Sequence, residues 1–268
     1  MQQHAVNSWF EAHARVWSDV YSGSGLSDII YQQRRDRALG WVDHLGLSTE
    51  TSVLDLGCGA GFLAVALARR GMRVHAIDTV WAMLATTRAQ AVLEGRTVHV
   101  LQSDTHQLGL ADDGLDLVVA LGLVPWLHSP RVALREIARV LRPGGYLLVS
   151  ADNGARLSYL ADPRYNAFLE PVRNTGRRLV RRPRQPGINP WLHWPGEFDL
   201  LLQATGFEKV RSATLGFGPF TLFKQRLLPD AWGVRLHRYL QELADRRTPG
   251  LRLSGSHYLV LARARHRA

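Results

Sequence analysis

Glycines at every second position follow a short apolar stretch in the first quarter of the chain. The segment 53–62 reads VLDLGCGAGF and contains Gly57, Gly59 and Gly61. Glycine has no Cβ, so a ligand can approach this part of the backbone closely. The free N–H groups of a helix that begins just after the glycines would point at that ligand. The segment therefore predicts a strand that turns into a helix around a bound small molecule.

Two details of this loop indicate the kind of ligand. Dinucleotide-binding loops follow the pattern G-x-G-x-x-G, and here Phe62 occupies the position of the third glycine. Asp55 lies two residues before the first glycine. A carboxylate there suits a ligand with an ammonium group better than a pyrophosphate. The loop therefore disfavours an NAD(P) oxidoreductase.

Two more acidic residues lie at the ends of the next two predicted strands. Asp78 lies 21 residues after Gly57, where a carboxylate can accept hydrogen bonds from both hydroxyls of a ribose. Asp104 ends a third predicted strand, where it can accept a bond from an adenine amino group. Either acid alone could instead be a turn or helix-capping residue. Together with Asp55 they predict a ligand crevice at the carboxyl edge of a sheet.

The elements that must position these residues alternate along the chain. Helix is predicted within residues 8–46, and Gly46 ends it. Strands and helices then alternate, with strands predicted at 51–56, 72–79, 97–104, 115–124 and 146–153 and helices at 63–71, 80–95 and 130–145. Such alternation predicts right-handed βαβ units, a parallel sheet and a Rossmann-like doubly wound α/β fold.

The alternation breaks after residue 153. We predict one domain with N-terminal cap helices (1–46), a cofactor-binding core (47–153) and two insertions that cap the substrate (154–196 and 219–254). The first insertion is expected to contain one or two helices and a basic loop, without a clear strand. A helix and a strand are predicted within 198–216, the second insertion is mostly helical, and HYLVLARA (257–264) is the last strand.

Four segments occur in a fixed order over residues 35–153: VLDLGCGAGF, HAID, LQSDTHQLGLADDGLDLVVA and LREIARVLRPGGYLLVS. As a set they resemble the motifs of class I S-adenosylmethionine-dependent methyltransferases, and within them the type 11 subgroup that acts on small molecules. The resemblance implies a seven-stranded, mostly parallel sheet with an antiparallel last strand, and helical cap insertions. It also implies S-adenosylmethionine as cofactor, with S-adenosylhomocysteine as product.

The resemblance assigns roles to the residues described above. The glycines would line the methionine part of the cofactor, Asp55 would order the loop or hold the amino group, Asp78 would bind the ribose, and Asp104 with Thr105 the adenine. The whole expected cofactor site is Asp55, Gly57, Cys58, Gly59, Gly61, Asp78, Thr79, Asp104, Thr105 and Leu121. In the N-terminal helices, Tyr21, Tyr31 or Arg34 could cover the cofactor or simply pack the helices together.

The acceptor side is less defined. Methyl transfer from a sulfonium is an in-line displacement that needs a base only if the acceptor is protonated. His128 and His193 are candidate bases, with a surface or capping role as the alternative for His128. The segment 121–128, LGLVPWLH, lacks the motifs of enzymes that methylate nucleic-acid bases. Aromatic side chains in and near the predicted cap are candidate acceptor contacts: Trp126, Tyr159, Trp191 and Trp194.

Charge and composition bound the remaining possibilities. The net charge is +10, and the segment between Glu170 and Glu197 has arginines but no acidic residue. This segment could attract an anionic acceptor, a membrane surface or RNA, although no RNA-binding module is appended.

Cys58 is the single cysteine, which excludes disulfides and cysteine-rich zinc sites. The pair Asp152–Asn153 is similar to a magnesium-binding pair of catechol-type O-methyltransferases, but an apolar stretch replaces the other ligand, so no metal is expected.

These observations lead to one expectation with two alternatives. We expect O-methylation of a small molecule such as a secondary metabolite, quinone, lipid or glycoconjugate. An RNA or protein methyltransferase and a cofactor-binding scaffold without activity are the alternatives. The sequence has no apolar run of 18 residues and no secretory signal, so a cytoplasmic monomer or homodimer is expected. Nucleic acid is not an expected partner, whereas peripheral contact with a membrane stays open.

Overall fold

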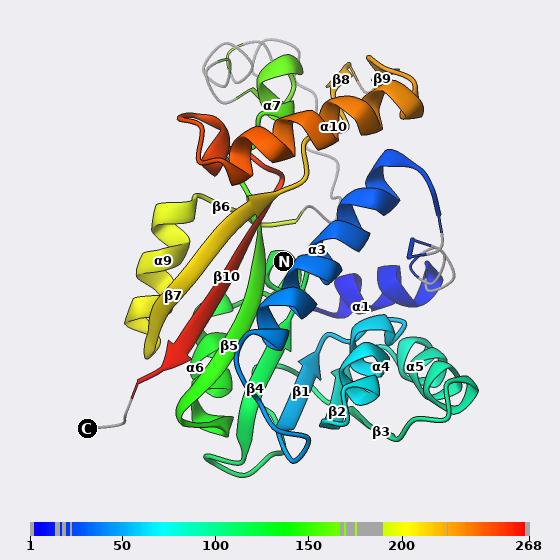
Figure 1. The fold of residues 1–268 in the computed structure, drawn as a ribbon, viewed down its shortest axis with the longest axis vertical. Coiled ribbons are helices and arrows are strands. Elements are labelled where there is room, and N and C mark those ends of the chain that lie inside the picture. The colour runs from blue at the N-terminus through cyan, green and yellow to red at the C-terminus, as the bar shows by residue number, and fades with distance from the viewer. Residues whose placement is uncertain are drawn as a thin grey trace.

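A twisted central sheet runs through the molecule (Figure 1). The structure is a computed structural model that describes residues 3–13, 17, 20–21, 23–166, 169, 175, 190–223 and 225–265. The strands lie side by side in the order β3–β2–β1–β4–β5–β10–β7. Their bounds are β1 Ser52–Leu56, β2 Arg73–Asp78, β3 Val98–Gln102, β4 Leu115–Ala120, β5 Leu141–Asn153, β7 Phe207–Leu215 and β10 His257–Ala264.

The direction of the strands agrees with the predicted fold. Strands β1 to β5 pair in parallel with their neighbours, whereas β10 lies antiparallel between β5 and β7. This confirms the Rossmann-like sheet with an antiparallel last strand. A two-residue strand, β6 (Leu192–His193), adds parallel pairing to the end of β5. The prediction of no strand in the first insertion was therefore wrong at these two residues.

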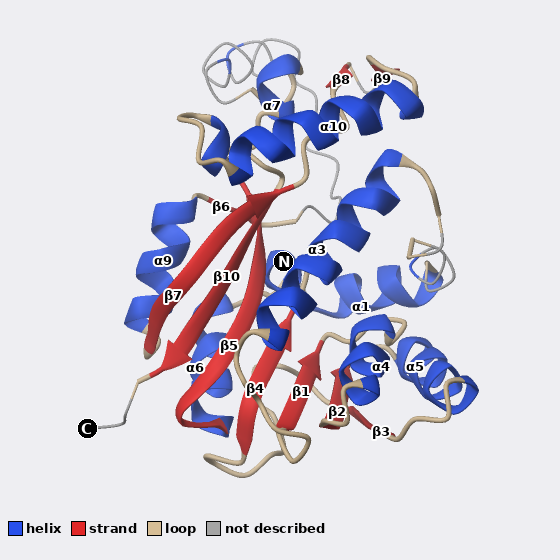
Figure 2. Cartoon of the chain, in the orientation of Figure 1, coloured by secondary structure: helices blue, strands red, loops and turns tan. Residues whose placement is uncertain are grey.

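Helices cover both faces of the sheet (Figure 2). Side chains of α6 (Pro130–Val140) and α9 (Pro195–Ala204) pack against one face, and those of α3 (Leu26–Asp43), α4 (Phe62–Arg69) and α5 (Trp81–Leu93) against the other. Successive strand residues enter opposite layers, as Val118 and Val119 of β4 do. Burial on both faces explains the nearly continuous apolar sequence of the strands.

Two predicted helices have different bounds in the structure. The helix expected at 130–145 ends at Val140, and Leu141 already belongs to β5, where it pairs with Leu115. Pro143 disfavours helical backbone at the residue before it, and Gly144 has a positive φ of 79°. The helical region expected before Gly46 contains two helices in the described residues, α1 (Gln3–Ala12) and α3.

Several further elements lie beyond the carboxyl ends of the parallel strands (Figure 1). They are α7 (Ser158–Ala161), the hairpin of β8 (Thr221–Leu222) and β9 (Gln225–Arg226), α10 (Asp230–Asp245) and the 3-10 helix Leu251–Leu253. The arginines of the basic segment lie outside the described residues: Arg173, Arg177, Arg178, Arg181, Arg182 and Arg184. Among the described helices, none has the length and apolar character needed to cross a membrane.

Candidate functional site

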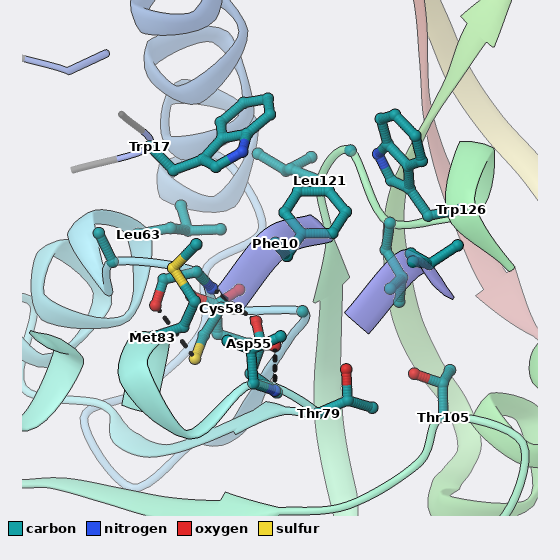
Figure 3. A pocket seen from close by; sticks show the side chains of 18 of the residues that line it. Phe10, Trp17, Asp55, Cys58, Leu63, Thr79, Met83, Thr105, Leu121 and Trp126 are labelled. Atoms are coloured by element: carbon teal, nitrogen blue, oxygen red, sulfur yellow. Dashed lines mark hydrogen bonds between the residues drawn. The ribbon is translucent and has the colours of Figure 1, made fainter. Parts of the chain in front are cut away.

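A cavity lies at the carboxyl edge of the parallel strands, between the sheet and helices α1 and α3 (Figure 3). Its walls contain all the expected cofactor residues except Gly61. The sheet order sets these residues in a row, because β3, β2 and β1 are neighbours and each is followed by part of the wall. The side chains or backbones that line it include Asp55, Gly57, Cys58, Gly59, Asp78, Thr79, Asp104, Thr105 and Leu121.

The glycine loop is held between β1 and the neighbouring elements. The backbone N–H groups of Gly57 and Cys58 both donate to the carbonyl of Ile77, over 2.7 and 3.0 Å. Gly61 begins α4 with φ of 82°, and a Cβ there would lie 2.8 Å from the Cα of Thr87 in α5. Gly61 therefore allows α4 and α5 to approach each other, and it supports the loop from behind rather than lining the cavity.

Asp78 connects this loop to the end of β2. Its carboxylate accepts hydrogen bonds from the backbone N–H groups of Gly59 (3.0 Å) and Val80 (2.9 Å). Burial raises the pKa of Asp78, and the backbone hydrogen bonds lower it in part. The next side chain, Thr79, donates its hydroxyl proton to Asn7 of α1 over 3.1 Å. The N-terminal helix is thus bonded to the edge of the cavity.

Asp104 and Thr105 form the wall beyond β3. The Asp104 carboxylate accepts from the backbone N–H of His106 (2.8 Å) and contacts the His106 ring nitrogen Nδ1 (2.6 Å). Burial raises the pKa of Asp104, but the hydrogen bonds from His106 outweigh it and leave the pKa below its usual value. Thr105 is buried. The lowered pKa keeps the carboxylate of Asp104 ionised at the end of the row.

Two oppositely charged side chains in the walls retain unused hydrogen-bonding capacity. Asp55 is 2% exposed, and its Oδ2 has no hydrogen-bond partner in the described part of the chain. Burial raises its pKa to about 7, with the Ala64 N–H opposing and the Asp78 charge adding to the shift. Arg34 of α3 is 4% exposed, and its buried Nε likewise lacks a partner among the described residues.

The surroundings of Arg34 fix the position of its guanidinium. The group lies over the ring of Tyr31, 5.0 Å from the ring centre. A Cβ at Gly122, in the loop after β4, would lie 3.0 Å from Nη1 of Arg34. No ion pair of Arg34 occurs within the described ranges. A cavity with a carboxyl and an unpaired guanidinium in its walls can hold a ligand that carries both an ammonium and a carboxylate, so these residues fit an amino-acid-bearing cofactor.

Aromatic side chains gather at the end of the cavity away from Thr79 and Thr105 (Figure 3). Trp126 lies in the 3-10 helix Val124–Trp126, stacks on Trp9 of α1 at 5.9 Å and meets Phe10 edge to face at 5.2 Å. Phe10, Trp17 and Trp126 line the cavity. This end of the cavity suits a flat or apolar molecule.

Most of the other predicted acceptor-side residues lie elsewhere. Tyr159 lines a separate cavity, with Arg156 and Tyr165 among its walls. Trp191 and Trp194 are exposed. His193, in β6, contacts Phe198 of α9. None of these four aromatic residues is part of the cavity beside the glycine loop.

His128 also lies outside the walls of this cavity. It is exposed, its ring lies 3.6 Å from that of His106, and its Nδ1 is 3.4 Å from Oε1 of Gln3. His106 itself lines the cavity. The structure thus brings His106, rather than His128, to the wall next to Asp104.

Two contributions to the cavity were not predicted from the sequence. One is His257, which lines it together with Asp152. The other is α1, whose residues Gln3, Val6, Asn7 and Phe10 form part of the wall. Because the last strand was predicted to be antiparallel, its first residue could have been placed beside the end of β5. The sequence carries no comparable signal for the position of α1.

The pair Asp152–Asn153 is engaged within the protein. Asp152 pairs with His257 (3.2 Å) and with Arg156 (3.3 Å). The Asn153 side-chain amide donates to the carbonyls of Leu253 and Gly255, each over 2.7 Å. Among the described residues, no group of three or more His, Cys, Asp or Glu side chains could hold a metal ion.

Comparisons with known proteins agree with this geometry. Residues 54–149 match the family model described as a methyltransferase domain. The ubiquinone biosynthesis O-methyltransferase of Pseudomonas aeruginosa (strain UCBPP-PA14) is 32% identical over 159 residues. That alignment covers 59% of this chain and 66% of the relative, just under two thirds of its length.

Solved structures share the fold over nearly the whole chain. Magnesium protoporphyrin IX methyltransferase from Synechocystis PCC 6803, solved with bound S-adenosylhomocysteine, has a TM-score of 0.65 at 18% identity, with 98% of this chain and 100% of that chain covered. A cyclase has a TM-score of 0.63 at 17% identity, with coverage of 97% and 95%. Since one neighbour is a methyltransferase and the other a cyclase, the likeness establishes the fold and leaves the chemistry to the site.

Proposed function

We propose that this chain is a class I S-adenosylmethionine-dependent methyltransferase and that it transfers a methyl group to a hydroxyl of a small-molecule acceptor. The observation that carries the proposal is that Asp55 and Arg34 line one cavity with Asp78, and that Oδ2 of Asp55 and Nε of Arg34 have no hydrogen-bond partner among the described residues. The ammonium group of an amino acid suits Asp55 and its carboxylate suits Arg34, whereas the hydroxyls of a ribose suit Asp78. Bound there, S-adenosylmethionine supplies a methyl group made electrophilic by its sulfonium.

The order of the strands supports one arrangement of the cofactor. Asp104 and Thr105, after β3, would contact the adenine, and Asp78, at the end of β2, the ribose. The loop after β1 and Asp55 would hold the methionine part, with Arg34 taking its carboxylate. The acceptor would then lie beyond β1, toward β4 and β5.

The lining of that remaining part supports a flat, apolar acceptor. Phe10, Trp17 and Trp126 provide aromatic surface there, and apolar walls with a few polar groups are typical of small-molecule sites. The relatives called ubiquinone biosynthesis O-methyltransferase favour oxygen as the methylated atom. Among the expected acceptor classes, a hydroxylated aromatic ring of the quinone type has the most support.

The cofactor assignment predicts that the Asp78→Ala variant binds the cofactor more weakly. We expect calorimetry to give an affinity for S-adenosylhomocysteine at least about tenfold below that of the wild type, because the ribose hydroxyls lose their acceptor. Asp36→Ala, an exposed change on α3, is the matched control and should bind normally. The assignment is wrong if Asp78→Ala binds as tightly as the wild type, or if the wild type prefers a nicotinamide dinucleotide.

The acceptor class is tested by incubating the protein and radiolabelled S-adenosylmethionine with a cell extract separated into small molecules, lipids, RNA and protein. We expect the label in the small-molecule fraction, or among lipids if the acceptor carries a hydrophobic tail. Label in RNA or protein would contradict the proposal.

The raised pKa of Asp55 predicts that the affinity for the cofactor depends on pH. In the free protein its pKa is raised to about 7, so below pH 7 the carboxyl is mostly neutral and must lose its proton to meet an ammonium. The affinity should therefore fall as the pH falls. Between pH 8 and pH 6 the dissociation constant for S-adenosylhomocysteine should rise about tenfold.

The control for this titration is Asp55→Asn, which cannot ionise. It should bind more weakly at pH 8 and show a nearly flat profile down to pH 6. Calorimetry in buffers of different ionisation enthalpy should also detect proton release on binding to the wild type below pH 7. A steep profile that persists in Asp55→Asn would assign the titration to another group.

A further inference from the structure

A histidine–aspartate pair lies in the cavity wall on the side away from Asp78. His257 is the first residue of β10, and antiparallel pairing sets it opposite Asp152 near the end of β5. Nδ1 of His257 is 3.2 Å from Oδ1 of Asp152, and both side chains line the cavity. In the sheet, β1 and β4 separate this pair from β2, which carries Asp78. The pair therefore borders the part of the cavity left for the acceptor.

The charged neighbours set the protonation of this pair. Burial raises the pKa of Asp152, but the hydrogen bond from His257 and the charges of Arg156 and Arg34 hold it far below its usual range. Burial lowers the pKa of His257; Asp152 raises it, and the two arginines lower it further. Tyr31 of α3 covers the ring at 5.6 Å. At neutral pH the pair is thus a carboxylate beside a neutral imidazole.

This protonation determines which ring nitrogen is basic. An ionised carboxylate can only accept a hydrogen bond, so Nδ1 of His257 carries the proton and donates it to Asp152. Nε2 then keeps its lone pair, and it makes no hydrogen bond to any residue in the described ranges. A neutral imidazole in the wall of a cavity, fixed by a carboxylate at one nitrogen and without a described hydrogen bond at the other, is suited to take a proton from a bound molecule.

We propose that His257 is the general base of this methyltransferase and removes the proton of an acceptor hydroxyl, while Asp152 positions its ring. This rests on the function proposed above. The acceptor O–H bond breaks and its proton moves to Nε2 of His257. The oxygen electron pair forms the new bond to the methyl carbon, and the electrons of the bond between that carbon and sulfur stay on sulfur. The imidazolium of His257 then releases the proton to solvent. The acceptor is thus an alcohol or phenol, whose reacting group is protonated at neutral pH, and not a carboxylate.

The first test replaces the base and keeps its hydrogen bond. In His257→Asn the side-chain amide can still donate to Asp152 but has no basic nitrogen. With 4-methylphenol as probe we expect kcat to fall at least about 100-fold. With 4-nitrophenol, which ionises near neutral pH without help, the loss should be less than about tenfold. Binding of S-adenosylhomocysteine should be unchanged, and the exposed His99→Asn should behave as wild type in both assays.

The pH profile separates a base from a packing residue. Wild-type kcat with 4-methylphenol should rise with pH and level off by neutral pH, because the pKa of His257 lies below its ordinary value. His257→Asn should show no plateau there and keep rising toward the pKa of the phenol. Asp152→Asn should also lower kcat, since an amide at this position can favour the other ring tautomer. Equal losses on both phenols, or loss in His128→Asn or His193→Asn instead, would overturn the proposal.

A spectroscopic test needs no acceptor. In the complex with S-adenosylhomocysteine at pH 7.5, nitrogen-15 NMR of labelled histidine should show His257 neutral and protonated on Nδ1, with the signal identified by its loss in His257→Asn. Protonation on Nε2, or a charged ring, would refute the assignment. A wild type that binds no S-adenosylhomocysteine would instead refute the proposed function. A wild type that binds it but methylates a carboxylate in the extract, and neither phenol, would refute only the role of His257.

Discussion

Replacement of Arg34 by methionine is expected to weaken the binding of S-adenosylhomocysteine by about 100-fold, because a buried charge pair broken at one partner costs about 3 kcal/mol. Methionine keeps the length and apolar character of the side chain against Tyr31. The affinity for 5′-methylthioadenosine, which has the same adenosine but no amino-acid group, should not change. Calorimetry with the two ligands therefore isolates the contact to the carboxylate.

The control for this variant is Arg37→Met on the same helix. Arg37 pairs with Asp245 of α10 over 2.6 Å and does not line the cavity, so its loss should leave both affinities unchanged. If Arg34→Met weakens both ligands equally, Arg34 supports the shape of the cavity and does not recognise the carboxylate.

The second large effect is expected for Gly61→Ala, which should lower the free energy of unfolding by about 3 kcal/mol. Two causes add. The backbone at Gly61 has φ of 82°, which L side chains adopt at a cost. The new Cβ would also lie 2.8 Å from the Cα of Thr87, so α4 and α5 would have to separate. Urea denaturation of the two proteins measures the difference.

A matched variant separates these causes. Gly95 has φ of 60°, and a Cβ there would meet nothing within 4 Å. Gly95→Ala therefore has only the backbone strain, and we expect it to cost about 1 kcal/mol. Similar losses at the two positions would show that α4 and α5 adapt to the added methyl group without cost.

The cofactor side of the cavity was predictable because its signals are local. A strand, a glycine turn and a helix follow each other within 20 residues, and the parallel direction of the strands brings Asp55, Asp78 and Asp104 to one edge. The confirmed fold depends on the same alternation of apolar strands and helices. The resemblance over residues 35–153 points to these elements as well.

The acceptor side was not predictable in the same way, since it depends on contacts between distant segments. His257 and Asp152 are 105 residues apart, and only the pairing of β10 with β5 brings them together. His128 follows the 3-10 helix Val124–Trp126 and His193 lies in β6, and neither side chain lines the cavity. Residue type alone could not rank these three histidines.

Helix α1 contacts both ends of the cavity at once. Asn7 accepts a hydrogen bond from Thr79 beside the ribose position, and Phe10, less than one turn further along, meets the ring of Trp126 at the acceptor end. A helix is too stiff for these two contacts to separate independently. Any displacement of these ten residues would therefore open the wall at both ends of the cavity together.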